Sequence, residues 1–216
     1  MKKLKILNCY CGIGGNRKLW GEDNEITAIE YDPEIAKVYQ ANFPNDTVIV
    51  TDAHEYLLKH FAEYNFIWCS PPCPSHSRAR FAVAVSGNEL QKPIYPKMTL
   101  YEEIIMLKHH CKALWLVENV IPYYDFLIKP TVQLHRHPFW CNFSIEHFEC
   151  DNERKHQDIR GPGEVYGFNL KGSKVKDRRQ VLRNMVDPDL GLHIFNAAKK
   201  EMGLKVQENQ AQLTLF

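Results

Sequence analysis

The run Ser70-Pro71-Pro72-Cys73-Pro74 directly follows the apolar segment 66–69 and most constrains the fold of this chain. Proline lacks a backbone N–H and has a fixed φ, so neither a strand nor a helix continues through the run. Segment 66–69 is therefore predicted to be a buried strand, followed by a rigid loop that carries the thiol of Cys73. We interpret Cys73 as a candidate nucleophile. A cysteine is more often a small buried apolar residue, and Cys69 keeps that interpretation.

A second predicted strand, 114–117, ends in the carboxyl group of Glu118. Neighbouring parallel strands end at the same sheet edge, so we expect Glu118 to lie near Cys73. An apolar environment can keep a carboxyl group protonated near pH 7, ready to protonate a ring nitrogen. The alternative for Glu118 is a structural salt bridge. A helix N-terminus or a nearby cation must lower the pKa of Cys73, and Arg78 and Arg80 are the candidate cations.

Strands and helices alternate along the chain, which predicts an α/β fold with a Rossmann-like, doubly wound, mostly parallel sheet. Asp32 followed by Pro33 is typical of a helix start, and Pro44 follows its end. In such a sheet, ligands bind at the carboxyl ends of the strands. The expected strands are 4–10, 25–30, 47–50, 66–69 and 114–117, and the expected helices are 16–20, 33–42, 53–59, 100–111 and 178–202.

The turn Gly12-Ile13-Gly14-Gly15 after the first strand indicates close approach of the backbone to a ligand. Glu30 follows the glycines at the distance typical of an acid that binds ribose hydroxyls. Asp52 is expected to accept from an adenine amino group, or alternatively to cap the helix at 53–59. The glycines lack the full Gly-x-Gly-x-x-Gly pattern, which disfavours nicotinamide cofactors.

Composition narrows the class of protein further. The net charge is +1, so any nucleic-acid surface must be local, and residues 151–183 hold nine Lys/Arg against five Asp/Glu. Seven cysteines, an odd number, favour a reducing compartment. No apolar run reaches about 18 residues, so we expect no membrane span and a cytoplasmic protein. A zinc site could use the group His135, His137, Cys141, His147 and Cys150, but its spacing fits no common zinc module, so we expect no metal.

Several motifs together resemble the DNA (cytosine-5)-methyltransferase family, in a small stand-alone form of bacterial or phage type. The segments 8–15, 28–44 and Asp52 resemble the first three motifs of the family. Ser70-Pro71-Pro72-Cys73 is similar to its Pro-Cys nucleophile motif, and Glu118-Asn119-Val120 to its Glu-Asn-Val motif. The similarity covers about 4–145 and resumes at 178–200.

The resemblance implies the cofactor S-adenosylmethionine and a covalent mechanism. It implies that a cytosine flips out of the duplex, that Cys73 attacks C6 and that Glu118 holds N3. The methyl group then goes to C5, and a base removes the C5 proton. The cofactor-binding residues that it implies are Tyr10, Gly12, Ile13, Gly14, Gly15, Glu30, Tyr31, Asp52, Ala53, Pro71, Leu100 and Asn184.

Two motifs depart from the family pattern. Gln133-Leu134-His135-Arg136-His137 stands where the family has Gln-x-Arg-x-Arg. Either Arg136, our third candidate catalytic residue, acts with shifted register, or the two histidines act instead. Asn184 fits the final Gly-Asn motif of the family, but Arg183 replaces the glycine.

The resemblance divides the chain into a catalytic domain of 1–142 and 177–204, a very small target-recognition insert at 143–176, and a tail at 205–216. So short an insert predicts low or short sequence specificity on double-stranded DNA. Gln212–Phe216 resembles peptides that dock on the bacterial replicative sliding clamp. Its alternative is a tail that packs on its own domain.

Two other functions remain open at this level. One is methylation of cytosine in RNA or in a free nucleotide, which shares the chemistry. The other is a non-catalytic DNA-binding protein that retains the fold.

Overall fold

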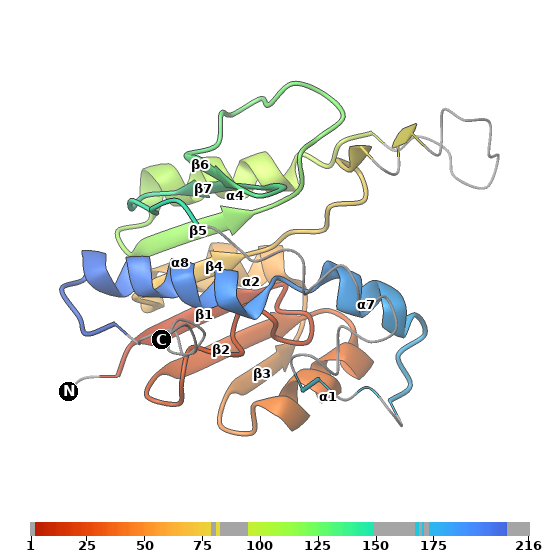
Figure 1. Ribbon diagram of the computed structural model, residues 1–216, viewed down its shortest axis with the longest axis vertical. Helices are drawn as coiled ribbons and strands as arrows, with labels where there is room; N and C mark the ends of the chain where they lie inside the picture. The colour runs from red at the N-terminus through yellow and green to blue at the C-terminus, as the bar shows by residue number, and fades with distance from the viewer. Residues whose placement is uncertain are drawn as a thin grey trace, which may run out of the picture.

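The computed structural model describes residues 3–78, 81–82, 95–148, 167–168, 170 and 173–206. Within them lies a seven-stranded sheet of order β3-β2-β1-β4-β5-β7-β6 (Figure 1). The first five strands run parallel, which confirms the predicted Rossmann-like sheet, and β7 runs antiparallel to both β5 and β6. The strands are β1 (Lys5–Cys9), β2 (Glu25–Glu30), β3 (Thr47–Val50), β4 (Phe66–Cys69), β5 (Leu114–Glu118), β6 (Val132–Leu134) and β7 (His137–Cys141).

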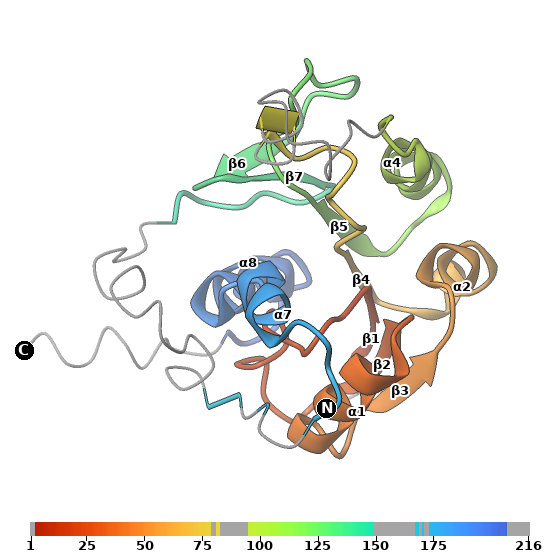
Figure 2. The same ribbon diagram turned by 90° about the vertical axis from the view of Figure 1, so that its right-hand side faces the viewer.

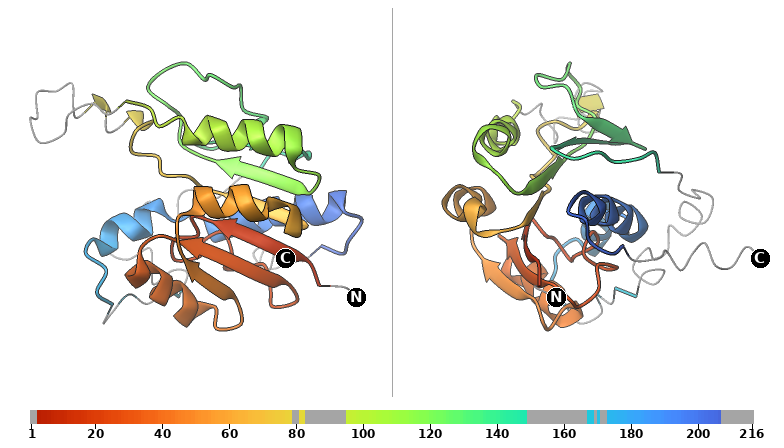
Figure 3. Two further views of the ribbon diagram at one scale, coloured as in Figure 1. Left: turned by 180° about the vertical axis from the view of Figure 1, so that it is seen from behind. Right: turned by 90° about the vertical axis from the view of Figure 1, so that its left-hand side faces the viewer.

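Helices cover both faces of the sheet. Figure 2 and Figure 3 show α2 (Ala53–His60) and α4 (Thr99–His110) on one side and α8 (Pro188–Glu201) on the other. The burial of β1 follows the two-residue strand period: Ile6 packs in the core beneath α8, and Leu7 packs in the core beneath α2 and α4. The remaining helical segments are α1 (Pro33–Asn42), the 3₁₀ turn η1 (Phe61–Glu63) and α7 (Arg178–Asn184).

Two expected helices differ from the structure. The region 178–202 forms two helices, because Asp187 caps a new helix that starts at Pro188. The helix expected at 16–20 is wrong, since this segment consists of turns. Its polar side chains are committed to tertiary partners: Asn16 Nδ2 donates to Asn8 at 2.8 Å, and buried Arg17 Nε donates to Asp46 at 2.9 Å.

The connections place the site at one edge. Helix α4 runs back against the strands, so Thr99 lies at their carboxyl edge and His110 at their amino edge, just before β5. Helix α7 lies at the side toward which the parallel strands point (Figure 1). In the described part of the chain, no helix combines the length and the apolar character needed to cross a membrane.

Candidate active site

Cys73 and Glu118 follow adjacent strands. Strands β4 and β5 pair in parallel with Cys69 opposite Val117, so the residues that follow them reach the same edge. Burial raises the pKa of the Cys73 thiol, and the charge of Glu118 raises it further. The pairing of β4 with β5 thus brings the two residues to the same edge of the sheet.

Backbone and amide hydrogen bonds fix the nucleophile loop against the segment after β5. Asn119 is buried, and its Nδ2 donates to the carbonyl of Pro71 at 2.9 Å. The N–H groups of His76 and Ser77 donate to the Cys73 carbonyl at 2.9 and 3.0 Å, and Tyr123 N donates to the His76 carbonyl at 3.0 Å. The asparagine of the Glu-Asn-Val motif therefore orients the loop that carries Cys73.

The expected effect of Arg78 on Cys73 is wrong. Arg78 Nε donates to the Pro122 carbonyl at 2.8 Å, where it braces the same segment. The pKa of Cys73 is raised, because burial and Glu118 together disfavour the thiolate. Arg80 lies outside the described residues. Cys69 is fully buried in β4, as expected.

The β6–β7 turn brings a histidine to Glu118. His137 Nδ1 lies 2.6 Å from Glu118 Oε1. Arg136 and His135 are exposed at the tip of the turn, and His135 has a positive φ of 52°. Of the two alternatives at this motif, the structure places a histidine, and not Arg136, against Glu118.

Glu30 closes the glycine turn. Its carboxylate accepts from the N–H groups of Gly12 and Asp32, both at 3.0 Å. A Cβ added to Gly12 would meet open space, whereas one at Gly14 would lie 2.3 Å from the Phe43 ring. Added at Gly15, it would lie 2.3 Å from the carbonyl of Val186. Only Gly12 of the three glycines thus leaves space for a ligand, and Gly14 and Gly15 permit close packing within the protein.

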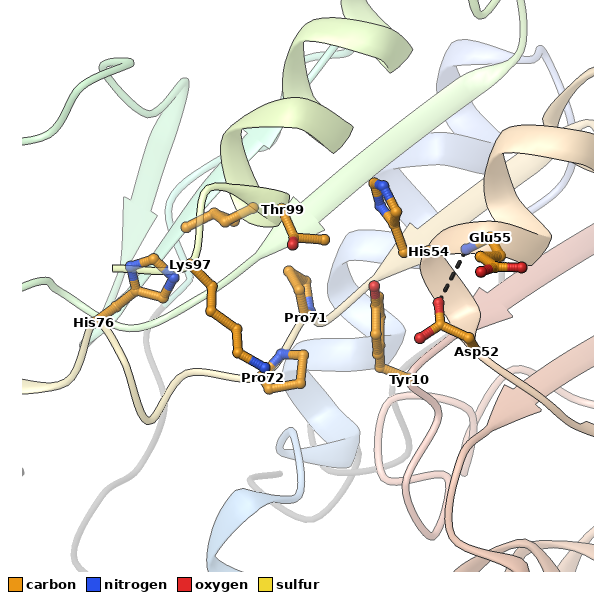
Figure 4. Close-up of a pocket in the computed structure, with 10 residues that line it drawn as sticks. Tyr10, Asp52, His54, Glu55, Pro71, Pro72, His76, Lys97 and Thr99 are labelled. Atoms are coloured by element: carbon orange, nitrogen blue, oxygen red, sulfur yellow. Dashed lines mark hydrogen bonds between the residues drawn. The ribbon is translucent and has the colours of Figure 1, made fainter. Parts of the chain in front are cut away.

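A pocket of about 260 Å³ opens beside this turn (Figure 4). Four of the expected cofactor residues line it: Tyr10, Asp52, Pro71 and Leu100. Asp52 also accepts from Glu55 N at 3.0 Å, which confirms the alternative of a helix cap. The pocket is also lined by residues that the sequence did not single out, His54, Glu55, Pro72, His76, Lys97 and Thr99.

The other expected cofactor residues lie around the pocket rather than in its wall. Ile13 and Ala53 are buried in the core, so a ligand could meet only their backbone. Tyr31 is 76% exposed directly after Glu30. Asn184 is exposed at the end of α7, next to Met185, whose side chain packs on Gly15.

An exposed basic surface flanks the same edge. We define it as Lys174, Lys176, Arg178, Arg179 and Arg183, on α7 and the segment before it. The segment 173–186 contains a single acidic residue, Asp177, which caps α7. On a chain with a net charge of +1, this surface concentrates positive charge beside the site.

Metal ligands do not gather in the described part of the chain, where no three His, Cys, Asp or Glu side chains form a group able to hold an ion. Cys150, part of the zinc alternative, lies outside the described residues. Cys141 donates its thiol to the Phe143 carbonyl at 3.2 Å.

The fold and this site define a methyltransferase of the Rossmann-like class. Residues 4–121 match the family described as C-5 cytosine-specific DNA methylase. The match covers more than half of the sequence, and the chain belongs to this family. No curated protein matches the sequence.

Solved structures of methyltransferases are similar to part of the chain. DNMT2 of Spodoptera frugiperda is 26% identical over 55% of this chain and 36% of its own, with a TM-score of 0.37. The methyltransferase yhhF of Escherichia coli is 19% identical over 64% of this chain and 74% of its own, with a TM-score of 0.39. The Entamoeba histolytica methyltransferase EhMeth is 15% identical over 56% of this chain and 39% of its own, with a TM-score of 0.34. The chain thus spans well under half of two of these proteins, and the family assignment rests on the sequence match.

The family implies S-adenosylmethionine as methyl donor, and the residues present fit it. Gly12 faces open space next to the carboxylate of Glu30, which suits ribose hydroxyls. Tyr10 and Leu100 supply apolar surface for a purine ring, and Asp52 supplies an acceptor at the mouth of the pocket (Figure 4).

Proposed function

We propose that this protein methylates C5 of cytosine in double-stranded DNA. One observation supports this most directly: paired parallel strands bring the thiol of Cys73 and the carboxyl group of Glu118 to one edge of the sheet, beside a pocket that suits an adenosyl group. A nucleophile and an acid at one position can attack and protonate the same pyrimidine ring.

Cys73 acts as the nucleophile. Its thiolate forms a bond to C6 of a cytosine that has left the base stack. The electron pair of the C5–C6 double bond moves into the ring, which makes C5 nucleophilic. S-Adenosylmethionine supplies the electrophilic methyl group that C5 accepts. Water then removes the C5 proton, the double bond re-forms and the Cys73 thiolate leaves.

Glu118 neutralises the charge that develops on the ring. The carboxyl group accepts from the exocyclic amino group and donates a proton to N3. His137 Nδ1 lies 2.6 Å from Oε1 of Glu118, so the imidazole fixes the orientation of the carboxyl group toward the ring.

The charge distribution favours a nucleic acid over a free nucleotide, and the family description names DNA. The basic surface on α7 lies at the same edge as Cys73 and would contact backbone phosphates without reading sequence (Figure 1). The expected clamp-binding peptide Gln212–Phe216 lies outside the described residues. We keep it as a proposal, because docking on a sliding clamp would raise the local concentration of DNA.

The test is covalent trapping on duplexes with one 5-fluorocytosine. Fluorine cannot leave C5 as a proton does, so the bond to Cys73 should persist after methyl transfer and appear as a mass increase on the peptide that holds Cys73. Cys73→Ala should give no adduct, whereas Cys111→Ala, at a half-buried cysteine after α4, should behave as wild type. Trapping on matched RNA but not on DNA would replace the proposed substrate. Cofactor binding without trapping on either would indicate a non-catalytic protein.

A further inference from the structure

Three side chains from three elements meet behind the cofactor pocket. Tyr10 follows β1, His54 belongs to α2 and Glu103 to α4. Tyr10 Oη donates to Glu103 Oε1 at 2.5 Å, and His54 Nδ1 lies 3.1 Å from the same oxygen. Tyr10 and His54 line the pocket (Figure 4), and Glu103 lies behind them with no exposed surface.

Glu103 is a charged residue on the buried, otherwise apolar face of α4. It shares the buried face of α4 with Leu100, Ile104 and Leu107. A buried carboxylate costs several kcal/mol unless it is paired. Its second oxygen, Oε2, is buried and has no hydrogen-bond partner among the described residues. A leucine at this position would avoid this cost, so packing alone does not explain the acid.

The contacts of Glu103 act on the pocket wall. Tyr10 has a φ of 57°, which is unusual for a residue with a side chain, so its ring needs a fixed tertiary contact. The hydroxyl is anchored to a residue 93 positions away. His54 is held between Glu103 and Glu102, whose Oε2 lies 3.7 Å from Nε2. Both wall residues thus depend on one buried oxygen.

We propose that Glu103 is a positioning residue of the cofactor pocket, which fixes the Tyr10 ring and the His54 imidazole in the orientation that binds the adenosyl group. The inference rests on the proposed use of this pocket for S-adenosylmethionine. Glu103 does not contact the ligand; it acts through Tyr10 and His54.

The experiment is a double-mutant cycle on the full chain with Tyr10→Phe, Glu103→Gln and the double variant. The dissociation constant of S-adenosylmethionine is measured by calorimetry without DNA, and folding by thermal unfolding. Each single change should raise the dissociation constant roughly tenfold, the usual effect of a lost hydrogen bond to a charged group. The double variant should be no weaker than the weaker single variant, because Tyr10→Phe removes the donor and Glu103→Gln removes the charged acceptor of the same contact. In turnover, KM for S-adenosylmethionine should rise with kcat unchanged.

The control is Glu63→Gln, which changes the exposed pair His60–Glu63 (2.7 Å) after α2 and should leave binding unchanged. If Glu103→Gln does not fold, Tyr10→Phe still tests the same contact from the pocket side. Wild-type affinity in Tyr10→Phe, or fully additive losses in the double variant, would overturn the inference. Failure of the wild-type protein to bind S-adenosylmethionine would instead overturn the proposed function.

Discussion

His137 Nδ1 and Glu118 Oε1 are 2.6 Å apart, across the boundary between the antiparallel strands β7 and β5. Because β7 runs against β5, its first residue lies at the edge where β5 ends. An imidazole therefore stands beside Glu118, at a position where the family pattern has an arginine. The contact makes the position of the Glu118 carboxyl group depend on a histidine.

His137→Gln should lower kcat for methyl transfer by about 10- to 100-fold, because a hydrogen bond to an ionisable partner is worth roughly 1.5–3 kcal/mol. Binding of S-adenosylmethionine should not change, since His137 is not part of the pocket wall. His135→Asn is the matched control: asparagine tolerates the positive φ of that exposed turn position. An equal loss in both variants would show that the turn, and not the contact with Glu118, matters.

Glu118→Gln should move two properties of the site in opposite directions. The charge of Glu118 raises the pKa of Cys73, so its removal should lower that pKa and speed alkylation of Cys73 by iodoacetamide at pH 7–8. Methyl transfer should fall by several orders of magnitude, because N3 loses its proton donor. Alkylation rates from peptide mass spectrometry between pH 6 and 10 measure the first effect. Unchanged or slower alkylation would contradict the proximity of the two groups.

In the wild-type protein, the raised pKa of Cys73 keeps the thiol protonated at neutral pH. The thiolate fraction, and with it the rate of the chemical step, should therefore rise with pH from 6 through at least 9, as long as the fold is intact. Single-turnover rates at saturating DNA, with circular dichroism as a check of folding, test this. A rate that levels off below pH 7 would mean that DNA binding lowers the pKa of the thiol.

Replacing Arg178, Arg179 and Arg183 by alanine should weaken duplex binding and reduce the salt dependence. Each lost phosphate contact lowers the slope of log K against log salt by about 0.9. The control triple, Lys59, Lys108 and Lys112 to alanine, removes the same charge near the amino edge of the sheet, at or after the ends of α2 and α4. Fluorescence anisotropy at several salt concentrations compares them. If the two triple variants gave the same slope of log K against log salt, binding would depend on the net charge of the protein and not on this surface.

Gly12→Ala should weaken cofactor binding, whereas Gly15→Ala should mainly lower the stability of the fold. At Gly12 the added Cβ meets nothing in the protein, so the cost is about 1–2 kcal/mol for its φ of 55°, but the methyl group enters the cofactor space. At Gly15 it meets the Val186 carbonyl at 2.3 Å, so stability should fall by at least 1–3 kcal/mol. Urea unfolding and cofactor titration together measure the two effects. Strong binding by Gly12→Ala would place the cofactor elsewhere.

Much of this fold could be predicted from the sequence, because local signals agree with it. Strand β4 and the first four residues of β5 are continuous apolar runs, and helices begin with clear caps such as Asp32-Pro33. The juxtaposition of Cys73 and Glu118 follows from strand order alone once the sheet is taken as parallel.

The β6–β7 hairpin could not be predicted in the same way. Pro138 lies within β7, between β5 and β6, and a proline inside an interior strand argues against such an assignment. The strand forms despite Pro138 because its carbonyl groups still accept hydrogen bonds: the Pro138 carbonyl accepts from Asn119 N at 3.2 Å. Glu103 carried a usable signal, an acid on an apolar helix face, but its partners are distant in sequence and only the fold brings them together.

The two ends of the expected recognition insert pack into the core of the fold. Phe143 is buried in the core beneath α8, and Glu146 and Phe148 contact Lys200 and His193 of that helix. At the other end, Phe168, Leu170 and Val175 are buried with Tyr39 and Phe43. Packing therefore does not separate the ends of 143–176 from the rest of the fold. A change of a buried residue at either end would be felt in the core before it altered any contact with a substrate.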